Sequence, residues 1–262
     1  MELKLRNDIK LRVEREKNAH GEDGILEAAV KLKDRFSHIM EGPSMQRCDI
    51  QENLFFDDVK NKSVLDIGCG FGEKSFMLAS RGANVLGVDI SDNYIEFCSS
   101  VQGQMTAGNL CKFKVMDVHY LDLPDNHFDY VFGRGIIHHL DLQRSMVEIR
   151  RVLKPGGRAI FLEPLAANPL LRLFRLLTPY ARTVDEQPLT SKDLLWIEKN
   201  WSVDSSYYGL ITAPLAMLTS LLIKRYPLNP LLLIADKLEI LVNKISFLQK
   251  YNQYVLLNLI KN

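Results

Sequence analysis

The chain has 262 residues, of which 47% are hydrophobic and 25% charged, and its formal net charge is +1. These proportions are ordinary for a soluble globular protein, and the charge gives no reason to expect a nucleic-acid partner. The length suffices for one large domain with a substantial core. The cysteines show neither CxxC spacing nor the density of a disulfide framework; they are Cys48, Cys69, Cys98 and Cys111. We therefore expect a cytoplasmic protein with reduced thiols and no bound metal.

The first sixty residues predict helices. Residues 1–17 alternate charged with apolar side chains at roughly helical spacing and lack the continuous apolar core of a secretory signal. Apolar positions between Ile25 and Phe36 mark a second helix, and a third is expected from about Met45 to Phe56, after the break at Gly42-Pro43-Ser44. We expect residues 1–60 to form a helical cap, either as a substrate lid or as simple packing.

From Ser63 onward, short apolar strands alternate with helices. Such alternation predicts an α/β fold with a doubly wound, mostly parallel sheet that helices cover on both faces. The predicted strands are 64–67, 84–88, 111–116, 129–132 and 158–162, and the predicted helices are 73–81, 92–101 and 142–153.

After Pro164 the sequence becomes rich in leucine. Its longest apolar stretch, Tyr208–Ile223, is shorter than the roughly 18 to 20 residues that cross a bilayer, so we expect a buried or interfacial helix. We predict a single domain with a cap (1–60), a cofactor-binding core (61–164) and substrate-side helices with a closing hairpin (165–262). The expected helices are 214–224 and 228–244, and the expected strands are 201–208 and 254–260.

The stretch Val64–Gly72 joins the first strand to the first helix of this core. Its apolar run stops at Asp66, and glycines follow at positions 68, 70 and 72. Glycines at a strand-to-helix turn allow the backbone to pass close to a bound cofactor. The stretch therefore predicts a nucleotide-type binding loop.

Acids end three of the first strands. They are Asp66, Asp89 and Asp117. The carboxyl ends of strands in an open α/β sheet form the ligand site, and Asp89 follows Asp66 at about the ~20-residue offset at which an acid meets a ribose diol. A single strand-end acid is more often a cap, but three beside a glycine loop favour a cofactor site.

The glycine spacing separates two cofactors. A dinucleotide fingerprint needs glycines at relative positions one, three and six, whereas here they stand at one, three and five, and Glu73 takes the sixth place. Carboxylates are badly placed beside a pyrophosphate but suit an amine and a sulfonium cation. The pattern favours S-adenosylmethionine over NAD.

These motifs resemble those of the class I S-adenosylmethionine-dependent methyltransferases, which are Rossmann-like. Val64–Gly72 is similar to the first motif of the family, and Val85–Ser91 to its second-strand motif. Asp117 and Leu121–Asp129 resemble the third-strand acid and the approach to strand four, and Leu153–Gly157 resembles the turn before strand five. The resemblance covers residues 63–163 and implies a sheet of seven strands whose last hairpin is antiparallel.

The resemblance also implies roles in a methyl transfer that leaves S-adenosylhomocysteine. The glycine loop with Asp66 faces the methionine part, Asp89 the ribose hydroxyls, and Asp117 with the Val118 backbone the adenine, while Gly133 and Arg134 line the floor near the methyl. The cofactor-binding residues so expected are Asp66, Gly68, Cys69, Gly70, Gly72, Asp89, Ile90, Asp117, Val118, Gly133 and Arg134.

His138 and His139 follow strand four and are the candidates for a general base. The alternative is that one of them serves packing or cofactor contacts. For the acceptor we single out Arg172 and Arg182, which suit an anionic group, and Tyr207, which could wall an apolar tunnel; core packing of the helices, and pairing of Arg182 with Asp185, remain alternatives.

The acceptor class is read from weaker signals. The segment Glu163–Leu173 and the segments around Leu177 and Arg182–Leu189 resemble a subgroup of bacterial small-molecule methyltransferases. Position 132–135 lacks the Asn/Asp-Pro-Pro-Tyr of nucleic-acid amino-methyltransferases, and no basic stripe is present. We expect methylation of O, N or C in a small, partly apolar natural product or a modified peptide. The alternatives are a cofactor-binding protein of this fold without methyl transfer, such as a cyclase, and a methyltransferase on a membrane surface with a lipid-like acceptor. The oligomeric state is open.

Overall fold

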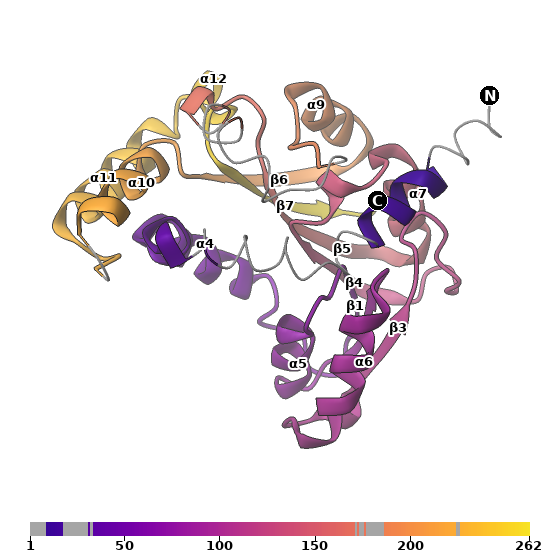
Figure 1. The fold of residues 1–262 in the computed structure, drawn as a ribbon. Helices are drawn as coiled ribbons and strands as arrows, with labels where there is room; N and C mark the ends of the chain where they lie inside the picture. Colours follow the sequence, from indigo (N-terminus) through magenta and orange to yellow (C-terminus); the bar gives the residue numbers. More distant parts are fainter. Residues whose placement is uncertain are drawn as a thin grey trace.

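The computed structural model describes residues 9–17, 31, 34–170, 172, 176, 186–223 and 226–262. It is built on a seven-stranded sheet with the order β3-β2-β1-β4-β5-β7-β6 (Figure 1). β1 to β5 are parallel to one another, while β7 runs antiparallel to both β5 and β6. This order confirms the predicted doubly wound sheet with an antiparallel closing hairpin.

The strands lie close to their predicted places. Their bounds are β1 Ser63–Ile67, β2 Asn84–Asp89, β3 Cys111–Val115, β4 Phe128–Arg134, β5 Leu153–Pro164, β6 Ser202–Tyr208 and β7 Tyr254–Ile260. β5 differs most from the prediction, which began it at residue 158. Leu153 is buried and pairs with Phe128, so sheet pairing starts before the Pro155-Gly156-Gly157 irregularity rather than after it.

The helices also follow the predicted pattern, with ends shifted by a few residues. They are residues 9–17, α3 Ser37–Glu41, α4 Pro43–Leu54, α5 Glu73–Ser80, α6 Asp92–Val101, α7 Leu142–Val152, α9 Ser191–Asn200, α10 Thr212–Leu222, α11 Pro230–Val242 and α12 Ser246–Gln249, with 3₁₀ turns η1 Gln102–Gln104, η2 Gly108–Leu110 and η3 Ile137–His139. Most of the expected second helix lies outside the described residues, as does most of the leucine-rich segment around residue 175.

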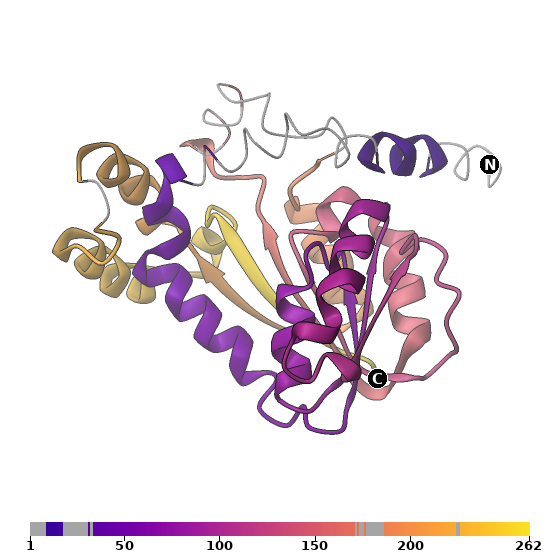
Figure 2. The same ribbon diagram turned by 60° about the horizontal axis from the view of Figure 1, so that its bottom comes forward.

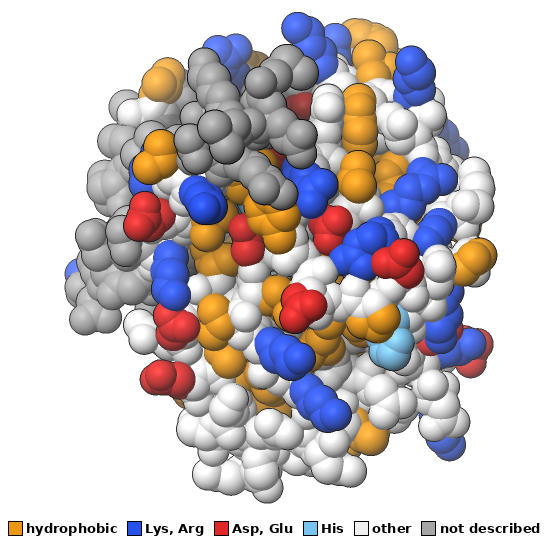
Figure 3. All heavy atoms as spheres, turned by 90° about the vertical axis from the view of Figure 1, so that its right-hand side faces the viewer, with side chains coloured by type: hydrophobic (Ala, Val, Ile, Leu, Met, Phe, Trp, Pro, Cys, Tyr) orange, Lys and Arg blue, Asp and Glu red, His pale blue; other side chains and the backbone are white. Residues whose placement is uncertain are grey.

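The helices α10, α11 and α12 form an insert between β6 and β7; α10 and α11 correspond to the two predicted helices, and the short α12 was not predicted. In Figures 1 and 2 α10 and α11 stand at one end of the molecule, beside α4 and far from β3 and α6. Among the residues that the structure describes, no helix combines the length and the apolar character that crossing a membrane requires. Figure 3 shows the opposite end, where Lys and Arg side chains are interspersed with Asp and Glu.

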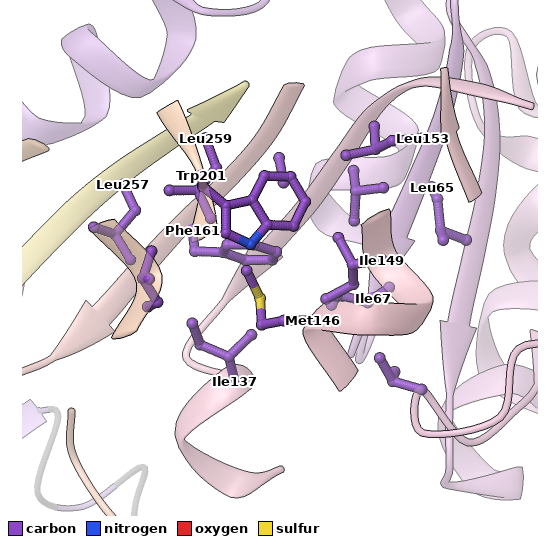
Figure 4. Packing of buried hydrophobic residues seen from close by; sticks show 14 of the residues in the cluster. Leu65, Ile67, Ile137, Met146, Ile149, Leu153, Phe161, Trp201, Leu257 and Leu259 are labelled. Atoms are coloured by element: carbon purple, nitrogen blue, oxygen red, sulfur yellow. The ribbon is translucent and has the colours of Figure 1, made fainter. Parts of the chain in front are cut away.

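Two apolar cores hold the sheet between its helices. On one face, Met146 and Ile149 of α7 and Trp201 after α9 pack on Phe161 of β5 and on neighbouring strand residues (Figure 4). On the other face, side chains of α4 and α5 pack on β1, β4 and β7. Helices cover both faces of these strands. The carboxyl ends of the strands are therefore the place where a ligand site can form.

Candidate functional site

The glycine loop after β1 is bent so that bare backbone faces a cavity. Gly68, Gly70 and Gly72 have φ angles of +65°, +50° and +75°, a region that side-chain-bearing residues avoid. A Cβ at Gly70 would meet no heavy atom within 4 Å, so this residue borders open space. The loop therefore leaves room for a ligand beside its backbone.

A cavity of about 230 Å³ lies at this loop. Its walls come from the carboxyl ends of β1 to β4 and from helix 9–17, which passes over these strand ends (Figure 2). Lys17, the last described residue of that helix, forms an ion pair with Asp92 at the start of α6. The lining residues are Arg12, Val13, Glu16, Gly68, Gly70, Phe71, Asp89, Ile90, Tyr94, Met116, Asp117, Val118, His119, Gly135, Ile136, His139 and Leu140.

Asp89, at the end of β2, ties this cavity to the glycine loop. Its carboxylate accepts hydrogen bonds from the backbone N–H of Gly70 at 3.0 Å and of Ser91 at 2.9 Å. Asp89 is buried but lines the cavity. A carboxylate oxygen has lone pairs beyond those that these two bonds use, so Asp89 can position the loop and accept ligand hydroxyls together.

Asp117, after β3, is held by a histidine that the sequence analysis did not single out. His119 accepts a hydrogen bond at Nε2 from the Asp141 N–H at 2.8 Å, and its Nδ1 lies 2.6 Å from Asp117 Oδ1. A neutral imidazole carries one proton, and Nε2 is occupied as an acceptor, so Nδ1 donates to Asp117. This bond fixes one carboxylate oxygen and leaves the other for the cavity.

A second cavity, of about 450 Å³, adjoins the first, since Gly68 and Phe71 line both. Asp66 borders it and accepts a hydrogen bond from Ser75 Oγ at 2.6 Å. Burial raises the pKa of Asp66 to about 7, although the Ser75 hydroxyl acts in the opposite direction. Arg134 also borders this cavity and pairs with Asp49 of α4.

The two cavities collect most of the predicted cofactor residues. The first is lined by Gly68, Gly70, Asp89, Ile90, Asp117 and Val118, and the second by Asp66, Gly68, Cys69 and Arg134. Gly72 and Gly133 line neither. A Cβ at Gly72 would lie 2.9 Å from Cys98 Sγ, and one at Gly133 would lie 2.5 Å from Ile136 Cγ2. These two glycines are required by close packing beneath the loop.

The two predicted histidines have different surroundings. His138 is buried, and its Nδ1 lies 2.6 Å from Glu163 Oε2. Glu163, at the end of β5, also accepts the backbone N–H groups of Ile136 and Ile137, each at 3.0 Å. Glu163 and His138 thus hold the turn after β4 in place.

His139 lines the first cavity instead. Its Nδ1 lies 3.2 Å from a carboxylate oxygen of Glu16, on the helix that covers the cavity. His138, His139 and Glu186 also bring one potential ligand atom each to within 4.8 Å of one another, a grouping that the sequence analysis did not anticipate. Of the two histidines, His139 is the one that a cavity ligand can contact.

The predicted acceptor residues do not come together at this site. Arg172 is exposed and lines neither cavity, and Arg182 lies outside the described residues. Tyr207 on β6 is half-buried against the core, and it too lines neither cavity. Their roles remain predictions.

Helix 9–17 is the part of the site that the sequence analysis left undecided between lid and packing. Its charged residues Arg12 and Glu16 face the cavity and the turn at His138 and His139: Arg12 Nη2 approaches the His138 carbonyl at 3.4 Å. No fixed spacing connects a helix near residue 12 to a turn near residue 138. The Asp-x-His pattern at 117–119 was the one available signal for His119.

The first cavity fits S-adenosylmethionine. The cofactor has an apolar adenine, a ribose diol, and an ammonium and a sulfonium that carry positive charge. Val13, Met116 and Val118 offer apolar surface, and Asp89 and Asp117 offer carboxylates at two strand ends. Open space lies beside Gly70. These carboxylates and apolar residues suit a cationic nucleoside better than a pyrophosphate.

Comparisons with known proteins agree with this geometry. Residues 65–161 match the family model described as "Methyltransferase domain". The chain is 33% identical over 122 residues to a sterol 4-C-methyltransferase of Caenorhabditis elegans, covering 46% of this chain and 36% of the relative. It is 37% identical over 120 residues to a 2-phytyl-1,4-naphtoquinone methyltransferase of Nostoc punctiforme, covering 44% of this chain and 52% of the relative.

A solved structure with a similar fold is that of the [4+2]-cyclase SpnF, with a TM-score of 0.55 at 18% identity over 83% of this chain and 82% of the other. This likeness concerns the fold alone. The chain spans about half or less of the length of the two relatives above. The seven-stranded sheet and the matched domain model support a class I S-adenosylmethionine-dependent methyltransferase domain at residues 65–161.

Proposed function

We propose that this protein transfers a methyl group from S-adenosylmethionine to a nucleophilic O, N or C atom of a small, partly apolar acceptor. The observation that carries the proposal is one cavity that combines the open loop at Gly70, the carboxylates of Asp89 and Asp117, and the His139 side chain. Three of these groups suit the donor, and the fourth faces the same space from the turn after β4.

In this proposal Asp89 accepts the ribose hydroxyls, and Asp117 with the Val118 backbone contacts the adenine. Gly68 lines both cavities and Asp66 lines the second, so in this proposal they contact the methionine part. When bound, S-adenosylmethionine supplies an electrophilic methyl on a sulfonium. The protein then mostly aligns donor and acceptor and excludes water, and helix 9–17 over the cavity serves the second task.

His139 takes the acceptor's proton where the nucleophile is a hydroxyl or an ammonium group. A carboxylate oxygen of Glu16 lies 3.2 Å from Nδ1, so Glu16 can orient the imidazole ring for this step. We expect His139→Ala to lower turnover at saturating cofactor about 100-fold. His127→Ala, at an exposed histidine after β3, is the matched control. Equal rates and pH profiles in both variants would exclude the base role.

The relatives' names and the apolar part of the cavity lining support this acceptor class. The two relatives are named for a sterol and a naphthoquinone, both largely apolar. A small natural product is the form of acceptor that we favour, and a modified peptide is the second. Mass spectrometry of a ligand that co-purifies with the full chain would identify the acceptor.

Calorimetry tests the donor. We expect S-adenosylmethionine and S-adenosylhomocysteine to bind and NAD not to bind; binding of NAD alone would refute the proposal. With an identified acceptor, each product molecule should be accompanied by one molecule of S-adenosylhomocysteine. Product that forms without S-adenosylhomocysteine would instead indicate a non-methylating enzyme of this fold, such as a cyclase.

A further inference from the structure

The insert α10–α12 exposes an unusual amount of apolar surface. Thirteen of the 24 large hydrophobic side chains that are exposed among the described residues lie between Leu218 and Phe247. Leu222 is 82% exposed, Ile234 58% and Leu241 58%. Contiguous exposed apolar surface on a protein marks an interaction site, whereas scattered single residues do not.

The burial pattern of α10 is the reverse of that of an ordinary surface helix. Its buried residues are small or polar, namely Thr212, Ala213, Ala216, Thr219 and Ser220. Three of its four leucines, Leu218, Leu221 and Leu222, are exposed, and Leu215 is half-buried. The buried hydroxyls bond to His38 of α3: Thr219 Oγ1 lies 2.9 Å from Nδ1, and Ser220 Oγ accepts the His38 N–H at 3.2 Å. Helices whose surroundings are lipid pack through small residues and turn large apolar ones outward.

Exposure on α11 extends around most of the helix. Its buried residues, Leu232, Ala235 and Glu239, form one narrow stripe at helical spacing. Exposed leucines and isoleucines occupy the other sides. A second protein chain covers one face of a helix, whereas a lipid layer into which the helix sinks covers several faces, so this distribution favours lipid.

The exposed charged side chains of the insert, among the described residues, are all positive. Lys237, Lys244 and Lys250 are exposed. Both acids are turned inward: Asp236 pairs with Arg47 of α4 at 2.8 Å, and Glu239 is fully buried. The outer surface of α10–α12 in the described residues is therefore apolar and basic, which complements an anionic bilayer surface. The end drawn in Figure 3 differs, because acids and bases mix there.

We propose that α10–α12 dock the protein on an anionic lipid bilayer, with α10 and α11 sunk into the interface rather than across it. α10 has 11 residues and α11 has 13, both well short of a membrane span.

The docked insert is connected to the site through α4. At one end of α4, Ser44 donates to Glu239 Oε1 at 2.7 Å, and Arg47 pairs with Asp236. Further along, Glu52 pairs with Lys74 at 2.6 Å beside the second cavity. Resting on the proposed function, this connection assigns the acceptor to amphiphiles that reside in the bilayer and reach the cavity from α4's side.

Vesicle co-sedimentation of the full chain tests the docking. We expect binding to vesicles of phosphatidylcholine with one quarter phosphatidylglycerol, and weaker binding to phosphatidylcholine alone. The double variant Leu222→Gln/Leu241→Gln should lower partitioning about tenfold or more, because it removes apolar contact without changing charge. Lys237→Gln/Lys244→Gln should lower binding to anionic vesicles about tenfold and remove their advantage.

The matched control is Leu195→Gln/Val147→Gln, at residues of α9 and α7 that are 64% and 54% exposed. It should bind vesicles like the unchanged chain. Absence of vesicle binding would overturn the proposal, as would sedimentation-velocity detection of a dimer that Leu222→Gln/Leu241→Gln dissociates. Calorimetry with S-adenosylmethionine separates the two proposals: docking without cofactor binding would overturn the proposed function alone.

Discussion

The first cavity and the α10–α12 insert place their polar and apolar side chains in opposite ways. At the cavity, the carboxylates of Asp89 and Asp117 stand at strand ends where backbone geometry leaves an opening, and the apolar core lies beneath the strands. In the insert, hydroxyls and a carboxylate are inside, and leucines are outside. The difference indicates that one region is shaped for a polar ligand in water and the other for an apolar surrounding. The two regions should therefore respond independently to substitution.

The largest effect is expected at Asp89. Asp89→Ala removes the acceptor of the Gly70 N–H and the proposed ribose contact, so the affinity for S-adenosylmethionine should fall about 100-fold, measured by calorimetry. Asp122→Ala, at an exposed acid, is the control. Vesicle binding should not change in either variant. A change in vesicle binding by Asp89→Ala would show that the two regions are coupled.

Glu239→Gln should act on the insert and on its contact with α4. The Glu239 carboxylate accepts the N–H groups of Gly209, Ile211 and Thr212, each at 2.9 Å. Loss of these charge-assisted bonds should lower the free energy of unfolding by about 1–3 kcal/mol. Chemical denaturation measures the change, and Glu198→Gln, at an exposed acid of α9, provides the reference. Unaltered stability would mean that α10 and α11 do not depend on this clamp.

Asp66 should make the stability of the cofactor-free protein depend on pH. Its pKa is about 7 in the folded chain and 3.8 as the ordinary value. Between these values the folded state keeps a proton that the unfolded state releases, so the unfolding free energy falls as pH rises, by about 1 kcal/mol per pH unit at most. The unfolding free energy of Asp66→Asn should lack this dependence on pH. Relative to the unchanged chain, the variant should therefore become more stable as pH rises toward 7. Parallel pH profiles of the two proteins would contradict the raised pKa.

The smallest effect is expected at Thr219. Thr219→Val keeps the shape of the side chain but removes the partner of His38 Nδ1, which should cost about 1 kcal/mol of unfolding free energy. Cofactor affinity should stay unchanged. If thermal denaturation shows that the valine variant is more stable, the buried hydroxyl is not what holds α10 against α3.

Residues whose position follows from chain direction could be predicted from the sequence. Asp66, Asp89 and Asp117 end parallel strands, so a parallel sheet brings them to one edge, and the structure places all three beside the two adjoining cavities. The seven strands and the antiparallel closing hairpin were expected from the resemblance to the class I methyltransferases, and the structure has both.

Residues whose position depends on long-range packing could not be predicted from the sequence. His119 gains its role from the Asp141 N–H, and Glu16 from a helix that crosses the cavity. α10 was expected as a helix, but the sequence did not show which of its faces is buried, because apolar residues at helical spacing normally mark the buried face. Here the leucines mark the outside.

The clamp at Glu163 has a consequence for how such an enzyme can change. One carboxylate on β5 holds Ile136, Ile137 and His138, so the turn after β4 keeps its shape without help from position 139. A different residue at 139 can therefore alter the reactivity offered to an acceptor while its scaffold stays intact. For engineering, position 139 is the place to diversify, and Glu163 the residue to leave untouched.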